Sequence, residues 1–266
     1  MDNSVDLQVL LQTADRPPHV REISKQISDE ARLESILQNA RDYAIAKGME
    51  SRMKSIRAAI ASEERNLDAI YNFSPLMIHE RVVPPVITEA KDIIQNPDTL
   101  TLKTTGVLYK IQKQAQFSTV APNWREYLTF PVTQYEVAFD ETPTRDLMPR
   151  TLAEKAKWKQ VTINSFKDGM DQADNILKYR LNKLNTDYNG MIRFHEFVIA
   201  GKITMPSISN RDLAIASTST AMALDQRLLT IRTLPAFEGN MTKWSTWITP
   251  VQYDPSGKPV TINKVD

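Results

Sequence analysis

The chain has 266 residues, of which 41% are hydrophobic and 24% charged, enough for one large folded domain or two small ones. Thirty-three basic and thirty-two acidic residues leave a formal net charge of +1, so there is no charge excess for binding nucleic acid or anionic lipid. The absence of cysteine excludes disulfides, thiolate nucleophiles and cysteine-ligated metals.

The first quarter of the sequence is predicted to be helical. Residues 1–19 are polar and contain two prolines, which is typical of a flexible leader. From Val20 to Lys47 apolar residues recur at three- and four-residue steps, which predicts a helix that Gly48 ends. A second helix is expected from Met49 to Tyr71, paired with the first as a hairpin about Gly48, and Pro75 limits its continuation.

Two consecutive prolines, Pro84 and Pro85, predict a rigid corner with an extended lead-in. Proline is well tolerated in the first turn of a helix, because the amide that it lacks would have no partner there. We therefore expect a third helix over Val86–Gln95, ended by the turn signal of Asn96, Pro97 and Asp98.

The pattern then changes toward strands. Residues 99–117 contain β-branched and aromatic residues in near alternation, which predicts a hairpin or two short strands interrupted at Thr105-Gly106. Pro122-Asn123 can start a short helical turn that presents Trp124 and Tyr127. The segment Pro131–Arg150 is rich in proline and charge, which indicates a mobile loop.

Thr151 and Glu154 match a capping box at the start of a long helix, whose apolar stripe continues to Tyr188. Gly190 is expected to break this helix, and a further short helix is closed by Gly201. From Ile203 the pattern becomes strand-like again, and residues 250–266 have the composition of a loose tail.

These elements predict an α+β fold. It is a mostly helical single domain over residues 20–249, in which two β patches pack against the long helix. We find no internal repeat, no secretory signal and no apolar stretch of transmembrane length in the sequence.

Signals for catalysis are absent from the sequence. The three histidines, His19, His79 and His195, stand in no zinc-binding spacing, and there is neither a glycine-rich phosphate loop nor a G-x-S-x-G elbow. We therefore expect no metal, no cofactor and no enzymatic activity. Carboxylate pairs that meet only in the folded chain stay open, although Glu63-Glu64 is typical of a solvated helix face.

Four blocks of sequence carry a resemblance to a known family: RNLDAIYNF, VVPPV, LYKIQKQAQF followed by PNWREYL, and KDGMDQADNIL. In this order they resemble the DotC family, a lipoprotein component of type IVB secretion systems, which include the Dot/Icm-like and conjugative plasmid systems. The resemblance implies a non-enzymatic part of the outer-membrane core complex of a Gram-negative bacterium. It also implies DotD-like and DotH-like partners on the periplasmic side and a ring-forming assembly.

Members of that family carry a signal peptide and an acylated cysteine, neither of which this sequence contains. The membrane anchor is therefore expected to be an N-terminal lipid outside these residues. Aromatic and arginine side chains dominate many interfaces, so candidate partner contacts are Tyr71, Phe73, Pro84, Pro85, Trp124, Arg125 and Tyr127. Core packing is the alternative for the aromatic residues. A periplasmic protein that binds or cleaves peptidoglycan is the alternative function.

Overall fold

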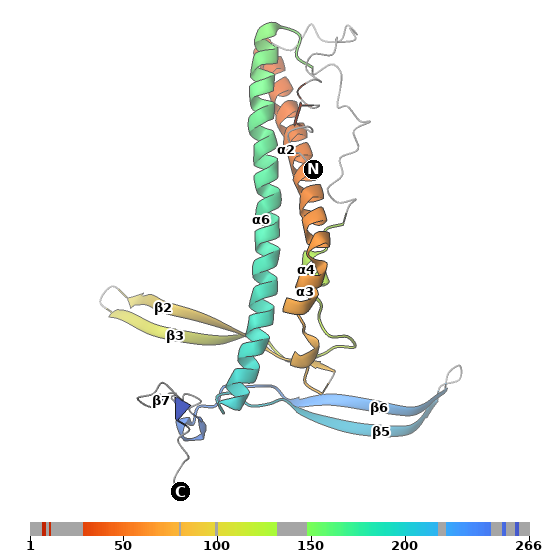
Figure 1. The fold of residues 1–266 in the computed structure, drawn as a ribbon, viewed down its shortest axis with the longest axis vertical. Helices are drawn as coiled ribbons and strands as arrows, with labels where there is room; N and C mark the ends of the chain where they lie inside the picture. Colours follow the sequence, from red (N-terminus) through yellow and green to blue (C-terminus); the bar gives the residue numbers. More distant parts are fainter. Residues whose placement is uncertain are drawn as a thin grey trace. The chain divides into compact units, whose positions relative to one another are not determined.

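The computed structural model describes residues 7–8, 11, 29–79, 81–98, 101–131, 148–217, 222–245, 252–253 and 259–260 (Figure 1). The chain divides into two compact units, one formed by residues 1–71 and 123–184 and the other by residues 72–122 and 185–266. The predicted domain limits at residues 20 and 249 stay predictions. Most of the predicted mobile loop, Pro131–Arg150, lies outside the described residues.

The first unit is helical. Its elements are α2 (Asp29–Ser62), α3 (Glu64–Ile70), α4 (Trp124–Leu128) and the first part of α6 (Leu152–Ile199). Figure 1 shows α2 and α6 running alongside each other. The prediction that Gly48 ends a helix was wrong, because α2 passes through it without interruption and ends at Ser62.

Two glycines explain how closely α2 and α6 approach. A Cβ atom placed on Gly48 would lie 2.1 Å from the carbonyl oxygen of Phe166, and one placed on Gly169 would lie 2.1 Å from that of Ile45. Each helix therefore contributes a glycine that faces the backbone of the other, a contact that any larger residue would prevent. Gly48 is buried, and its role is close packing rather than helix termination.

Apolar side chains fill the contact between α2 and α6 on both sides of these glycines. Toward the start of α2, Ile36 and Ala40 pack with Trp158. Toward its end, Met53 and Ile56 pack with Ala173 and with Phe130, which follows α4. An ion pair between Arg52 Nε and Asp174 Oδ1, 2.8 Å apart, joins the two helices.

The predicted capping box of α6 is confirmed. Thr151 Oγ1 accepts the Glu154 amide at 3.1 Å, and Glu154 Oε2 accepts the Thr151 amide at 3.2 Å, so both free amides are satisfied. The same carboxylate pairs with Arg32 of α2 at 2.7 Å. The predicted break at Gly190 was wrong, since α6 continues to Ile199. Gly201 follows with φ +66°, the left-handed conformation in which glycine stops a helix.

The second unit contains two long β-hairpins. In the first, β2 (Val86–Asp98) pairs antiparallel with β3 (Thr101–Lys113). The helix predicted over Val86–Gln95 was therefore wrong, because β-branched residues and pairing with β3 prevail over a short helical spacing. The strand character predicted over residues 99–117 is confirmed, but the predicted interruption at Thr105-Gly106 was wrong, because β3 is one strand that passes through Gly106 and pairs with β2. The short strands β1 (Val82–Val83) and β4 (Gln116–Phe117) pair beside the hairpin base.

The second hairpin confirms the strand pattern expected after Ile203. It pairs β5 (Ser207–Ser217) with β6 (Met222–Thr233). Shorter elements are the 3-10 helices η2 (Ser74–Leu76) and η4 (Met241–Lys243) and the paired strands β7 (Gln252–Tyr253) and β8 (Pro259–Val260). The rest of the predicted tail lies outside the described residues, as does the leader except residues 7, 8 and 11, which are helical.

The bases of both hairpins share one core with the C-terminal part of α6. Ile87 of β2 and Phe194 of α6 are fully buried there, and Ile208 and Ile231 of the second hairpin pack against the same cluster. Gly190 lies against Val86 and Ile87, where a Cβ atom would meet the Val86 side chain at 2.5 Å. Arg193 donates to the Ile87 carbonyl at 2.8 Å. The predicted α+β fold, with two β patches packed on a long helix, is confirmed.

Replacing Gly48 with alanine is expected to destabilise the first unit, because the new methyl group would collide with the Phe166 carbonyl. Overpacking costs about 1–3 kcal/mol of unfolding free energy, and a backbone atom cannot rotate away as a side chain can. Each kcal/mol lowers the thermal midpoint by about 2–4 °C in a domain of this size.

Gly106→Ala is the matched control, since a Cβ atom there meets nothing within 4 Å. We expect it to change the unfolding free energy by no more than about 0.5 kcal/mol. An unchanged midpoint in the Gly48→Ala protein would contradict the close backbone contact.

Candidate interaction site

The short helix α4 places one aromatic and one cationic side chain next to each other. Asn123 caps it, because its side-chain oxygen accepts the Arg125 amide at 2.9 Å. Trp124 then points inward and is buried, while Arg125 stays partly exposed. The predicted helical turn at Pro122-Asn123 is confirmed.

Both side chains converge on α3. Asp68 Oδ1 accepts Trp124 Nε1 at 2.8 Å and Arg125 Nη1 at 2.6 Å, and Asp68 Oδ2 accepts Arg125 Nη2 at 3.0 Å. Arg125 also pairs with Glu64, and its guanidinium carbon lies 4.4 Å from the centre of the Trp124 ring. We call Glu64, Asp68, Trp124 and Arg125 the Arg125 cluster.

Hydrogen bonds set the ionisation of this cluster. The Arg125 hydrogen bond, followed by that of Trp124, lowers the pKa of Asp68 below its ordinary value. The carboxylates of Asp68 and Glu64 in turn raise the pKa of Arg125. The three charged side chains are about half exposed, so solvent screens their attraction, and the cluster presents fixed charges to the surroundings.

The segment after α4 is held by α6. Arg180 of α6 donates to the carbonyl of Tyr127 at 3.2 Å and to that of Thr129 at 3.1 Å. The Arg180 guanidinium also lies 4.8 Å from the centre of the buried Phe130 ring. The backbone around Arg125 is thus fixed from two sides, which favours a rigid binding surface over a mobile one.

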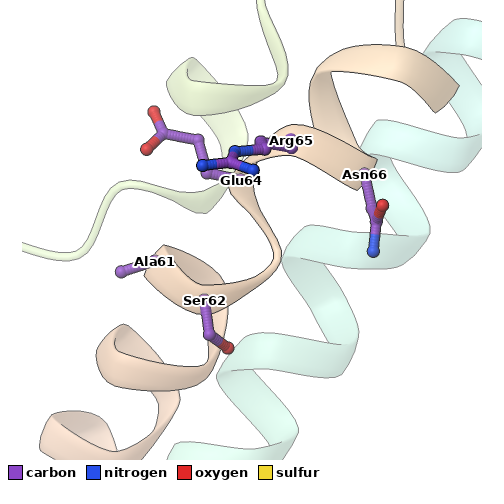
Figure 2. Close-up of a pocket in the computed structure, with 5 residues that line it drawn as sticks. All are labelled: Ala61, Ser62, Glu64, Arg65 and Asn66. Carbon is purple, nitrogen blue, oxygen red and sulfur yellow. The ribbon is translucent and has the colours of Figure 1, made fainter.

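A polar hollow adjoins the cluster at the junction of α2 and α3. Figure 2 shows its five lining residues, Ala61, Ser62, Glu64, Arg65 and Asn66, with Glu64 and Arg65 projecting to the opposite side from Asn66. Its volume is about 460 Å³. Glu64 belongs to both the hollow and the Arg125 cluster, so a partner that enters the hollow would meet the charged cluster at its edge.

The amino-acid sequence matches a described protein family. Residues 30–246, which span most of the chain, match a family described as type IV secretory system, conjugal DNA-protein transfer. The chain belongs to this TraI family. No curated protein matches the sequence. The family match supports a role in type IV secretion and conjugal transfer, which agrees with the coarser part of the sequence-based prediction.

The structure separates the seven predicted contact residues of this TraI-family chain into two groups. Tyr71, Arg125 and Tyr127 are partly exposed in the first unit, and their role as partner contacts stays a prediction. Trp124 is buried in the first unit. Phe73, Pro84 and Pro85 are buried in the second, where the Phe73 ring centre lies 5.0 Å from that of Tyr188. Their burial agrees with core packing, which was the alternative for the aromatic residues Trp124 and Phe73, and a partner contact by any of the four stays a prediction.

Sequence reasoning missed the acidic half of the cluster. Glu64 and Asp68 stand four residues apart and so share one face of α3, which was a usable signal for a cation-binding helix face. What sequence could not show is that Arg125, 57 residues away from Asp68, would bind there.

The described residues of this TraI-family chain also bear on metal binding and on membrane insertion. No group of three or more histidine, aspartate or glutamate side chains is placed to hold a metal ion in that part of the chain. No described helix is long and apolar enough to cross a membrane. His195 Nε2 lies 2.7 Å from the Leu76 carbonyl oxygen, a contact that fixes η2 on α6.

Asp68→Asn is expected to lower the thermal midpoint at neutral pH and to lose this effect in acid. The pKa of Asp68 is lower in the folded than in the unfolded protein, where it is about 3.9. The charged carboxylate therefore stabilises the folded protein above about pH 3.9, and this stabilisation is lost as the pH falls through the pKa of the folded state. Thermal midpoints of both proteins between pH 7 and pH 3 measure the difference.

Asp171→Asn, an exposed position on α6, is the control for a change in net charge. If the midpoint difference for Asp68→Asn were the same at pH 3 as at pH 7, its origin would be steric and the ionic account would be contradicted.

Proposed function

We propose that this chain is a structural subunit of the outer-membrane core complex of a type IVB secretion or conjugation system, acting by binding and without catalysis. The observation that carries the proposal is the TraI-family match over residues 30–246. The four sequence blocks that resemble the DotC family all lie inside this range and favour the finer assignment.

The structure gives three of those blocks a physical role in the first unit. RNLDAIYNF supplies Asp68, PNWREYL supplies Trp124 and Arg125, and KDGMDQADNIL supplies Gly169 and the Asp174 partner of Arg52. The blocks thus hold the residues that join α2, α3, α4 and α6. A rigid support with fixed surface charges is what a structural subunit needs, whereas a catalytic subunit needs a reactive group that meets its substrate.

In this proposal the chain holds DotD-like and DotH-like partners on the periplasmic side of the outer membrane. A nearly neutral protein needs an anchor for stable membrane residence, and one acyl chain gives only marginal binding. An N-terminal lipid with several chains, repeated over the subunits of a ring, would raise the effective concentration at the membrane enough for firm attachment.

The Arg125 cluster is the proposed partner surface, because it combines half-exposed charges with a fixed backbone. Arg125→Glu should reduce partner recovery about tenfold in co-purification from a membrane extract, as loss of an interfacial charge pair does. The variant chain itself should still fractionate with the outer membrane. Arg41→Glu, on an exposed position of α2, is the matched control and should retain the partner.

A charge-swapped protein, Arg125→Glu with Asp68→Arg, separates contact from folding. The swap restores an internal ion pair, although an arginine at position 68 cannot accept the Trp124 Nε1 hydrogen. The thermal midpoint should therefore recover in part while partner recovery stays low. Recovery of the partner together with the midpoint would mean that Arg125 acts only inside this chain. Release of muropeptides by the purified chain would overturn the non-catalytic proposal and favour the peptidoglycan alternative.

A further inference from the structure

The second unit contains a groove of about 540 Å³, whose lining residues include none of the Arg125 cluster. One side is formed by His79, Arg81 and the exposed ring of Phe117, and the other by Asn210, Arg227 and Leu229 of the β5–β6 hairpin. Val82 and Ile208 complete the lining. The groove therefore combines apolar with cationic residues.

The His79 side is a tight loop with an unusual backbone. Ile78 and Val82 close the loop by exchanging two hydrogen bonds, of 2.8 Å from the Ile78 amide and 3.0 Å from the Val82 amide. Between them His79 has φ +48°, a left-handed conformation that residues other than glycine adopt at a cost. This backbone conformation places the His79 side chain at the edge of the groove.

The hairpin side follows from strand register. Ile208 pairs with Ile231, Asn210 with Leu229, and Asp212 with Arg227, so all six residues share one face of the hairpin. The first pair packs against the core of the unit. Further along this face of β6, away from the core, lie Leu229 and then Arg227, which both line the groove. The hairpin thus contributes one apolar and one cationic side chain to it.

Charge defines which ligand the groove would accept. The described residues that line it include Arg81, Arg227 and His79 but no carboxylate. Arg227 pairs with Asp212 at 3.1 Å, yet both are about two-thirds exposed, so this pair is weak and open to exchange. Arg81 has no ion-pair partner among the described residues. Glu80, the next residue after His79, lies outside them.

The strand next to the groove also has free backbone groups. The Ser118 amide donates to the Arg81 carbonyl at 2.9 Å, and hydrogen-bonding direction alternates along an antiparallel ladder. The backbone groups of Phe117 therefore face the outer edge of β4, where no described strand pairs with them. An open edge of this kind can bind an extended peptide by adding a strand.

From this geometry we infer that the groove is a docking site for an extended segment of a partner protein in which pairs of apolar side chains alternate with pairs of carboxylates. Residues two apart in an extended segment face the same way, as Leu229 and Arg227 do on the hairpin. The apolar residues contact Phe117 and Leu229, the carboxylates pair with Arg81 and Arg227, and the segment's backbone pairs with the edge of β4. This inference concerns the second unit and does not depend on the proposed function.

The probe that tests it is a capped, fluorescein-labelled peptide that repeats two valines followed by two glutamates. Fluorescence anisotropy measures its binding to the purified chain. Arg81→Glu should weaken binding about tenfold, because it replaces an attractive charge with a repulsive one. Phe117→Ala should weaken it independently of charge. Binding should also decrease as salt concentration rises.

Arg232→Glu is the matched control, because Arg232 hydrogen-bonds to Ser209 on the opposite face of the same hairpin. It should bind the probe as the wild type does, and a peptide with lysine in place of glutamate should not bind. Far-ultraviolet circular dichroism confirms folding of each variant.

Equal loss of binding in Arg81→Glu and Arg232→Glu, or equal binding of the lysine peptide, would overturn the inference. Self-association of the wild-type chain in analytical ultracentrifugation that Arg81→Glu abolishes would overturn it too, because the groove would then bind a second copy.

Discussion

The first unit depends on one steric constraint, the approach of α2 and α6 to direct backbone contact at Gly48 and Gly169. Because neither glycine has a Cβ atom, the helices lie close enough for the apolar residues on both sides to interdigitate. That contact places Phe130 between Met53 and Ala173, and so fixes the segment that leads from α4. The Arg125 cluster is rigid because its backbone is joined to this helix pair through Arg180.

The second unit is organised differently, around a small core at the bases of two long hairpins. A two-stranded hairpin is only marginally stable alone, so each depends on the residues that join it to α6. Phe194 and Gly190 provide the contact surface, and Arg193 binds the backbone of β2. Away from the core, the first hairpin exposes large apolar side chains, with Ile94 67% and Leu102 62% exposed. The exposed apolar side chains of the β2–β3 hairpin form a surface that another subunit of a larger assembly can cover.

Capping signals were read correctly from sequence, whereas the helix predicted over Val86–Gln95 and the contacts between distant residues were not. The capping box at Thr151 and the Asn123 cap need only neighbouring residues, and strand alternation identified the second hairpin. Gly48 and Gly190 were read as helix stops because a glycine that ends a helix and one that permits close packing look alike without the opposing backbone. At the candidate site, Trp124 and Arg125 were named from the sequence as candidate contacts, which stays a prediction. Asp68 was not named, because its role depends on a residue 57 positions away.

We propose that this TraI-family chain acts as a structural subunit through the surface around Arg125. Site-specific photo-cross-linking in cells that carry out conjugal transfer tests it most directly. A photoreactive residue at the partly exposed Tyr127 should form an adduct with another protein of the transfer apparatus. The same residue at Tyr179, which is 69% exposed on α6, should not. Transfer at normal frequency with no adduct from Tyr127, or equal adducts from both positions, would contradict the account.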